Sequence, residues 1–472
     1  MSPGHLVRLT GMTEDRTFHR LLLNTLVTGV TGSFVWFALT FWVFLETRSV
    51  VATGVIGAAF SLSSAVLGPV FGTYIDRHRK HASMLLSTSV AAGFYAAATA
   101  VFLAVDAGEI LEMTRPWFWL LVAFTLLGSV AGSMRGIALS TCVTLLVTED
   151  RRDKANGLVG SVTGVSFAIT SVFSGLVIGQ LGMGWALYGA LALTAGALLH
   201  LATLRIPEDA PTRSEGDQTS AFDVRTAVEA IRAVPGLPML VGLAAFNNLL
   251  LGAFMALMDP YGLSLVSVET WGFLWGGIML AFVAGGLLVA KRGLGSAPVK
   301  VVVTGNLISW AIASTFVLRS SIVLLVVGLF VWLLLMPVIE AAEQTVLQQS
   351  IPFDRQGRVF GFAQMIENAT APVTAICMAP LAEAVFMPLM TDGKGADWIG
   401  GWFGTGPDRG IALIFTLAGI VGVLVSLLVR ASRSYRLLAE APAAPSDPAE
   451  PVALPCPEPC REPGPGLVPV AA

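Results

Sequence analysis

Charged side chains are scarce in this sequence. Asp, Glu, Lys and Arg together make up 12% of the 472 residues, whereas hydrophobic residues make up 55%. Soluble globular chains carry about 25% charged residues. The composition therefore excludes a large soluble domain and indicates a protein that crosses a membrane many times. The net charge of −3 indicates no partner of either sign, and no feature of the chain calls for nucleic acid.

Cysteine is also scarce, with four residues in the chain. Cys142 and Cys377 fall in hydrophobic runs and Cys456 and Cys460 near the C-terminus, so no disulfide framework or zinc spacing is present. The sequence contains no phosphate-binding Gly-x-x-x-x-Gly-Lys-Ser/Thr loop, no metal-binding histidine pair and no Gly-x-Ser-x-Gly turn. We therefore predict no ATP-driven pump, no enzyme, no metal and no cofactor.

Long hydrophobic runs, by contrast, follow one another along the whole chain. Each has roughly 20 residues or more, enough to cross a bilayer as a helix. The predicted spans are residues 21–45, 51–75, 83–105, 116–147, 157–179, 183–204, 237–258, 271–290, 299–318, 321–349, 358–386 and 410–430. The first run is too long for the core of a signal peptide, so we expect it to stay uncleaved. These twelve spans predict an all-α membrane protein.

Lysine and arginine are distributed unequally between the two sets of loops that alternate along the chain. With a cytoplasmic N-terminus, most of the 28 basic residues fall in cytoplasmic loops. The outer loops receive only Arg48, Arg115, Arg319, Lys394 and Arg409, and Arg135 lies within a span. The positive-inside rule therefore predicts that both termini are cytoplasmic.

The hydrophobic pattern is interrupted in the middle of the chain. Residues 205–236 contain prolines and mixed charges and end in the amphipathic run 222–232, which predicts a flexible link followed by an interfacial helix. The predicted organisation is an N-terminus at 1–20, a six-helix bundle at 21–204, a linker at 205–236, a second six-helix bundle at 237–432 and a tail at 433–472. The tail holds ten prolines between 441 and 472, so we expect it to be disordered.

The two sides of the linker repeat one another. Asp150-Arg151-Arg152-Asp153-Lys154 follows the fourth span, and Asp354-Arg355-Gln356-Gly357-Arg358 follows the tenth span at a constant offset. After the eighth span, Gly286 to Lys291 matches Gly72 to Arg77, with Ala290 in place of the acid. Parallel repeats of this kind are typical of transporters built from two helix bundles.

A motif at the end of the second span carries a family resemblance. The stretch Gly72-Thr73-Tyr74-Ile75-Asp76-Arg77-His78-Arg79-Lys80-His81 resembles the Gly-x-Leu-x-Asp-Arg-x-Gly-Arg-Arg loop of the major facilitator superfamily. The sequence keeps Gly72, Asp76, Arg77 and Lys80, and it departs from the pattern at Tyr74, Arg79 and His81. The resemblance implies a major facilitator fold of twelve helices in two pseudo-symmetric six-helix bundles.

The same resemblance implies a conformational gate in this region, in which Asp76 contacts the start of the eleventh helix. An anion is stabilised there by unpaired amides and the helix dipole. The predicted gate residues are Gly72, Asp76, Arg77, Lys80, Asp150, Arg151, Asp354, Arg355 and Arg358. For the basic residues, the gate and a role in membrane topology alone explain the pattern equally well. Topology requires no acidic residue, so the gate is the favoured interpretation for Asp76.

Four ionisable residues within the spans are candidates for proton coupling. Arg135 lies in the fourth span, where an unpaired charge is costly, and it resembles the arginine of proton-coupled drug antiporters. Glu340 and Glu343 share one face of the tenth span, and Glu367 lies at a comparable depth in the eleventh. Low polarity and mutual repulsion make at least one of these acids a proton acceptor near neutral pH. A buried ion pair for Arg135 and a structural hydrogen-bond network for the acids are the competing interpretations.

Amides and aromatic residues supply the candidates for a substrate cavity. Asn24 in the first span corresponds to the doublet Asn247-Asn248 in the seventh, and amides in a membrane either bond to a neighbouring helix or line a cavity. For Asn24, packing is the simpler interpretation, whereas the doublet favours cavity exposure of one amide. Trp36, Phe37 and Phe41 can stack on an apolar molecule, although aromatic residues also serve as packing or interface belts.

Residues 16–432 resemble the macrolide-efflux-like drug:proton antiporters, above all in Glu343–Gln349 and Gln356–Gly361. The resemblance implies export of bulky amphipathic small molecules by alternating access, driven by a proton gradient and feasible for a monomer. The fifth span lacks the antiporter Gly-Pro element, so uniport stays open. Export of an endogenous metabolite, siderophore or lysolipid stays open too, as does a non-transporting sensor or assembly factor. The strong preference for arginine over lysine indicates a bacterial source and hence the bacterial inner membrane.

Overall fold

The computed structural model describes residues 3–47, 50–110, 112, 114–208 and 224–440, and within these ranges the secondary structure is helical with no strand. The first half contains α1 (Pro3–Thr47), α2 (Val50–Arg77), α3 (Lys80–Ala104), α4 (Ala107–Ile110), α5 (Pro116–Leu146), the 3-10 turn η1 (Glu149–Arg151), α6 (Arg152–Gln180) and α7 (Met183–Thr203). The all-α prediction is confirmed for the described residues.

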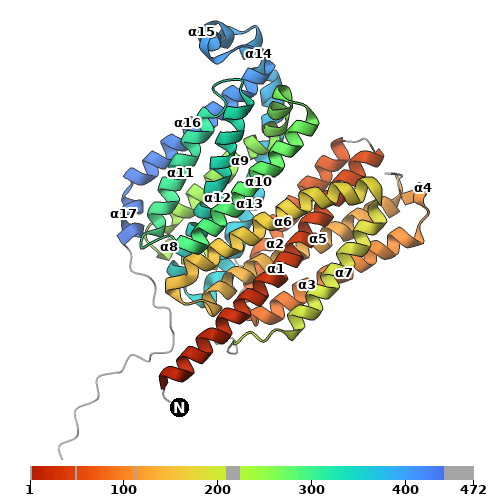
Figure 1. Ribbon diagram of the computed structural model, residues 1–472, viewed down its shortest axis with the longest axis vertical. Coiled ribbons are helices and arrows are strands. Elements are labelled where there is room, and N and C mark those ends of the chain that lie inside the picture. The colour runs from red at the N-terminus through yellow and green to blue at the C-terminus, as the bar shows by residue number, and fades with distance from the viewer. Residues whose placement is uncertain (1–2, 48–49, 111, 113, 209–223, 441–472) are drawn as a thin grey trace, which may run out of the picture.

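The second half is preceded by α8 (Val224–Ala233), which falls within the predicted amphipathic run. It contains α9 (Leu237–Leu265), α10 (Val268–Arg292), α11 (Pro298–Thr315), α12 (Ile322–Ser350), the 3-10 turn η2 (Phe353–Arg355), α13 (Gln356–Leu381), the π-helical turn η3 (Ala382–Phe386), α14 (Met387–Thr391), α15 (Lys394–Phe403), α16 (Pro407–Ala431) and α17 (Arg433–Glu440). Figure 1 shows the two halves side by side, with α8 and α17 close to one end of the second half.

Each of the twelve predicted spans corresponds to one long helix. Within the described residues, nine helical segments are long and apolar enough to cross a membrane, and they correspond to all or part of α1, α3, α5, α7, α9, α10, α12, α13 and α16. The other three predicted spans are α2, α6 and α11, of 28, 29 and 18 residues. α2 and α6 pack against α13 and α10 of the opposite half.

The hydrophobic core shows how the halves are joined. At the ends of the helices where the loops at 78–79, 147–151 and 351–355 lie, here called the inner end, one cluster combines both halves, for example Ile75 and Leu146 with Leu347 and Phe360. At the opposite, outer end the core separates into one cluster within residues 34–190 and another within residues 253–418. In the part of the chain that the structure describes, the halves therefore share a core only at the inner end, which the sequence predicts to be cytoplasmic.

Local sequence signals explain where the helices begin. Proline lies in the first turn of α5, α9, α11 and α16, where its missing N–H group leaves no hydrogen bond unmade. Ser267 and Ser321 accept hydrogen bonds from backbone N–H groups of the first turns of α10 and α12. Gly236 precedes α9 with φ of +88°, a backbone conformation that favours glycine.

The expectation of a disordered tail at 433–472 is wrong at its beginning, because residues 433–440 form α17. Leu438 on this helix is buried and contacts Gly236, where a Cβ atom would meet the Leu438 Cβ at 2.8 Å. An apolar contact with the start of α9 therefore orders this segment. Residues 441–472, which carry the ten prolines and the pair Cys456 and Cys460, lie outside the described residues.

Candidate functional site

Asp76 joins the two halves at the inner end. Its side chain accepts hydrogen bonds from the backbone N–H groups of Gly357 at 2.7 Å and Arg358 at 2.9 Å. Both amides belong to the first turn of α13, whose N–H groups have no partner within the helix. The Arg358 Nε atom lies 3.7 Å from the same carboxylate. The contact expected between Asp76 and the start of the eleventh helix is thus present in this conformation.

Glycines allow α2 and α13 to approach closely enough for this contact. A Cβ atom on Gly72 would collide with the carbonyl oxygen of Gly357, and one on Gly68 would lie 2.6 Å from the carbonyl oxygen of Gly361. Larger residues would separate the helix axes and withdraw Asp76 from the amides. Gly72, which the sequence assigned to the gate, therefore acts through helix packing.

A second contact joins α6 to α10, the pair that corresponds to α13 and α2 in the repeat. Asp153 in the first turn of α6 accepts a hydrogen bond from the backbone N–H of Leu294 at 2.6 Å, just beyond the end of α10. Gly157 lies against the backbone of Ala290, the position where α10 lacks an acid. In this pair the acidic residue lies on α6, which corresponds to α13, whereas in the other pair it lies on α2. Asp153 was not among the predicted gate residues.

A third contact consists of uncharged side chains between α6 and α12. The Asn156 Nδ2 group donates to Thr345 Oγ1 and to Gln348 Oε1, both at 2.9 Å, and Gln348 Nε2 donates to the carbonyl oxygen of Ser140 at 3.0 Å. All three amide and hydroxyl side chains are buried. Together, Asp76, Asp153 and this cluster form what we call the inner interface. Neither Asn156 nor Gln348 was predicted from the sequence.

The other predicted gate residues lie around this interface. Lys80 is buried, with its Nζ atom 4.8 Å from the centre of the Phe353 ring, and Arg77 ends α2. Asp150, Arg151, Asp354 and Arg355 are exposed on the 3-10 turns η1 and η2, and Asp354 and Arg355 pair with each other at 3.8 Å. Glu208, not predicted, accepts the backbone N–H of Lys80 at 2.7 Å and so caps α3.

A cavity of about 270 Å³ lies within the second half, which we call the C-half cavity. Its wall is formed by side chains from five helices: Leu240, Val241, Ala244, Ala245, Asn247, Asn248 and Leu251 of α9, Phe282 of α10, Asn306, Ser309 and Trp310 of α11, Trp332, Met336, Ile339, Glu340, Glu343, Gln344 and Leu347 of α12, and Ala363, Ile366 and Glu367 of α13. Part of the wall is apolar and aromatic, and part is polar.

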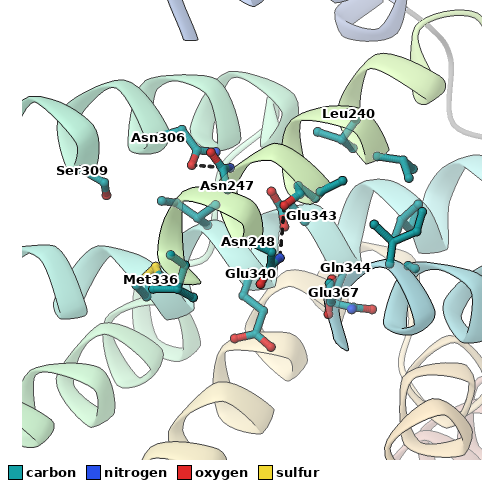
Figure 2. Close-up of a pocket in the computed structure, with 18 of the residues that line it drawn as sticks. Leu240, Asn247, Asn248, Asn306, Ser309, Met336, Glu340, Glu343, Gln344 and Glu367 are labelled. Atoms are coloured by element: carbon teal, nitrogen blue, oxygen red, sulfur yellow. Dashed lines mark hydrogen bonds between the residues drawn. The ribbon is translucent and has the colours of Figure 1, made fainter. Parts of the chain in front are cut away.

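The three glutamates predicted for proton coupling meet in this cavity (Figure 2). Glu343 and Glu367 are half-buried, and Glu340 keeps an accessible surface because it faces open space inside the molecule. None of the three forms an ion pair with a basic residue of the described chain, and Glu343 Oε1 is buried without a hydrogen-bond partner. An ionised carboxylate without a counter-ion in such a place costs free energy. A proton or an external cation bound to these groups would remove this cost.

An amide network forms another part of the wall. Asn247 Nδ2 donates to Asn306 Oδ1 at 2.8 Å (Figure 2). The Trp310 indole N–H donates to Asn247 Oδ1 at 2.9 Å. Asn248 donates to the carbonyl oxygen of Ala244 in its own helix. The sequence favoured cavity exposure of one amide of the doublet, and both line the cavity.

A smaller cavity of about 60 Å³ lies between the halves. It is lined by Leu139, Ser140 and Val143 of α5, Asn156, Val159 and Gly160 of α6, and Pro337, Glu340, Ala341 and Gln344 of α12. Glu340 and Gln344 therefore border both cavities. This position makes them the boundary between the interior of the second half and the interface with the first.

Arg135 is buried in the first half without an acidic partner among the described residues. Its guanidinium donates to the side-chain oxygen of Asn24 and, at 3.2 Å, to the hydroxyl of Thr88. Asn24 also donates to the carbonyl oxygen of Ala197 and lies 3.0 Å from a ring nitrogen of His200. Asn24 thus packs between helices and lines neither cavity, in agreement with its simpler interpretation.

The aromatic candidates of α1 lie away from both cavities. Trp36 packs on Phe60 with ring centres 4.7 Å apart, and Phe37 stacks on Phe41, whose side chain is exposed. The aromatic residues that do line the C-half cavity are Phe282, Trp310 and Trp332. Nothing in their sequence neighbourhood distinguishes them from other aromatic residues of the apolar spans.

The chain has the architecture of a membrane transport protein: two helical bundles share a core at one end, and the second bundle encloses a cavity whose wall is partly polar. The chain belongs to the Major Facilitator Superfamily, whose model matches residues 21–375. The family expected from the Gly72–Lys80 motif is confirmed. The family and the fold are those of multi-pass membrane transporters.

Relatives and solved structures are distant. The chain is 23% identical to macrolide efflux protein A of Streptococcus pyogenes over 78% of its own length and 90% of that protein. It is 25% identical to human solute carrier family 67 member A1 over 59% of its own length, and the match covers 62% of that protein, less than two thirds.

Two solved structures share the fold. That of the human organic anion transporter MFSD10 (TETRAN) has a TM-score of 0.62 at 17% identity, covering 91% of this chain and all of that one. A bacterial homologue of the iron transporter ferroportin in the outward-facing state has a TM-score of 0.66 at 15% identity, covering 88% of this chain and all of that one.

Proposed function

We propose that this protein is a secondary active exporter of amphipathic small molecules that exchanges its substrate for protons across a bacterial inner membrane. The observation that carries the proposal is the C-half cavity, in which Glu340, Glu343 and Glu367 have no basic partner within the described chain. Buried carboxyl groups that lack a counter-ion bind protons readily. The likeness to a macrolide efflux protein supports export as the direction of transport.

Alternating access would proceed by movement of the two bundles against each other. In the described conformation the inner interface is formed by Asp76, Asp153 and the Asn156 cluster. Release of these contacts would let the cavity open inward. Substrate would then bind from the inside, and proton binding at the glutamates after outward release would return the empty protein. Among the described residues, no titratable side chain from α9, α10 or α11 lines the cavity, so α12 and α13 would carry the coupling.

The test is a transport assay in liposomes that contain the purified full-length protein and a pH-sensitive dye. A proton gradient is imposed, and macrolides and lipophilic amines are added one at a time. We expect substrate-dependent dissipation of the gradient, reduced in Glu343→Gln and retained in Glu383→Gln, an exposed glutamate outside the cavity.

Two outcomes would contradict the proposal. Substrate movement without proton flux would show uniport and leave the carboxyl groups with a structural role. Absence of movement for every compound, in protein shown to be folded by its thermal transition, would favour a metabolite exporter or a protein that does not transport.

A further inference from the structure

The C-half cavity also restricts the chemistry of the molecule it can hold. Its polar wall offers three carboxyl groups, and no Lys, Arg or His side chain of the described chain lines it. An anionic ligand would face repulsion from every ionised group in the wall, and a neutral ligand would leave these groups unpaired. A positively charged ligand would supply the missing counter-charge.

The carboxyl groups do not form a metal site. Within the described residues, no three His, Cys, Asp or Glu side chains are close enough together to hold a metal ion. The remaining wall includes Trp310, Trp332, Phe282 and Met336, which suits an apolar or aromatic group rather than a hydrated ion. The counter-charge is therefore expected on an organic molecule.

A second feature indicates a polar contact on α11. Ser309 lines the cavity and is 2% exposed, and its buried hydroxyl has no hydrogen-bond partner. A buried hydroxyl without a partner is destabilising, so its position next to the cavity points to a ligand group that supplies one. Figure 2 shows Ser309 on α11 and the glutamates on α12 and α13, separated along the cavity.

From these observations we propose that the C-half cavity binds an organic cation, with its charged nitrogen beside Glu340, Glu343 and Glu367 and its apolar part against Trp310, Trp332 and Met336. This inference rests on the proposed function and specifies the substrate class of the same site. The volume of about 270 Å³ lies just below the range of about 300–1,000 Å³ that is typical of ligand pockets. The cavity thus holds a small aromatic amine, or the amine-bearing arm of a larger molecule whose remainder lies beyond Glu340 and Gln344.

The position of the cavity has a further consequence. All of its lining residues belong to α9–α13, so the second half alone builds the cation site. In the first half, Arg135 is buried within α5 and is held by Asn24 and Thr88. Arg135 lines neither cavity, and selection of the cation is therefore assigned to the second half.

Binding can be measured without transport. The full-length protein in nanodiscs is equilibrated with radiolabelled benzyltrimethylammonium, whose charge is permanent, and uptake by empty nanodiscs is subtracted. Competitors are neopentylbenzene, in which carbon replaces the nitrogen, and the anion benzylsulfonate. We expect saturable binding that neither competitor displaces and that weakens at least roughly tenfold in Glu343→Gln and in Glu340→Gln.

Two controls locate the site. Glu383→Gln makes the same change of charge outside the cavity and should leave binding unchanged. Ala245→Leu fills the cavity without altering charge and should abolish binding, whereas Ala202→Leu on the exposed surface of α7 should not. The thermal transition of each variant shows that it is folded.

The outcomes separate this inference from the proposed function. Equal competition by the neutral analogue, unchanged binding in both glutamate variants, or absence of saturable binding would overturn the cation site. Transport of neutral amphipathic compounds in the liposome assay would then leave export standing. Conversely, cation binding with the expected variant pattern but no transport would support the site and contradict export.

Discussion

At the scale of single residues, Asp76 shows what a motif can predict and what it leaves out. The family resemblance of the motif implied a contact between Asp76 and the start of the eleventh helix, and the structure shows this contact with Gly357 and Arg358. Asp153 carries the corresponding contact between α6 and α10, but Ala290 at the expected position hid it. The sequence repeat shows which helices of the two halves correspond. It does not show which helix of a contacting pair carries the aspartate, because this is α2 in one pair and α6 in the other.

Replacement of Asp76 by Asn should loosen the start of α13. The variant loses a charge-assisted interaction with two backbone amides, worth about 1–3 kcal/mol. Hydrogen exchange in the peptide that contains Gly357 and Arg358 should become roughly tenfold faster or more, as measured by mass spectrometry. Asp150→Asn changes the charge at an exposed position and should leave that peptide unchanged. Unchanged exchange in Asp76→Asn would mean that the contact is not populated in solution.

Arg409 is a residue whose role the sequence concealed. Counting charges for topology placed it in an outer loop, but it is 1% exposed. Its guanidinium donates to the Tyr261 hydroxyl and to the carbonyl oxygens of Val317 and Leu318, and it lies 4.2 Å from the centre of the Phe403 ring. A forked, planar donor makes these contacts possible, which a charge count cannot reveal.

Arg409→Lys should therefore destabilise the outer end of the second half. Lysine keeps the charge but cannot reproduce the forked donors, and the expected loss is about 1–3 kcal/mol. The thermal transition of the purified protein should move to lower temperature. Arg319→Lys, an exposed arginine on a neighbouring loop, should show no comparable shift. Equal transitions for both variants would show that charge alone matters at position 409.

At the scale of helices, hydropathy located the spans but not the structure between them. A run of roughly 20 apolar residues in a membrane can satisfy its backbone only as a helix, which is why each predicted span is one. The segment after α13 was predicted only up to residue 386, yet it continues through the π-helical turn η3 into α14 and α15. Prolines at 372, 380 and 388 remove backbone donors there, and tertiary packing decides the outcome.

Helix packing leads to a prediction about Gly72. In Gly72→Ala the added methyl group meets the carbonyl oxygen of Gly357 and must separate α2 from α13. The expected cost of about 1–3 kcal/mol exceeds the gain of about 0.5–1 kcal/mol from replacing glycine within a helix. Thermal unfolding should therefore occur at lower temperature. Gly93→Ala, where the methyl group meets open space, should be neutral or slightly stabilising. The opposite order would contradict the close approach of the two helices.

At the scale of the whole molecule, the sequence predicted the arrangement of bundles better than the position of the site. Composition, twelve spans and the repeat were enough for the architecture, because each follows from local pattern. The three glutamates were predicted as one group because Glu340 and Glu343 share one face of the tenth span and Glu367 lies at a comparable depth in the eleventh. Asn306, Ser309, Trp310 and Trp332 belong to the same site only because α11 packs against α12 and contacts Asn247 of α9 through side chains, which no local pattern encodes.

The inner interface should set the balance between the two orientations of the bundles. Asp76 and Asp153 join different helix pairs, so their contributions should be nearly additive. In the double variant Asp76→Asn with Asp153→Asn, a loss of about 1–3 kcal/mol per contact should shift the population strongly toward the inward-open form. The outer ends of the halves should then approach one another.

This shift can be measured by electron paramagnetic resonance between spin labels at Glu109 and Arg319, which are exposed at the outer ends of opposite halves. The labels are attached to introduced cysteines after the native cysteines have been replaced by serine. Asp150→Asn with Asp354→Asn removes the same two charges from exposed positions and should leave the distance distribution unchanged. A double variant with the distances of the parent protein would show that the shared core at the inner end, rather than the two aspartates, holds the halves together.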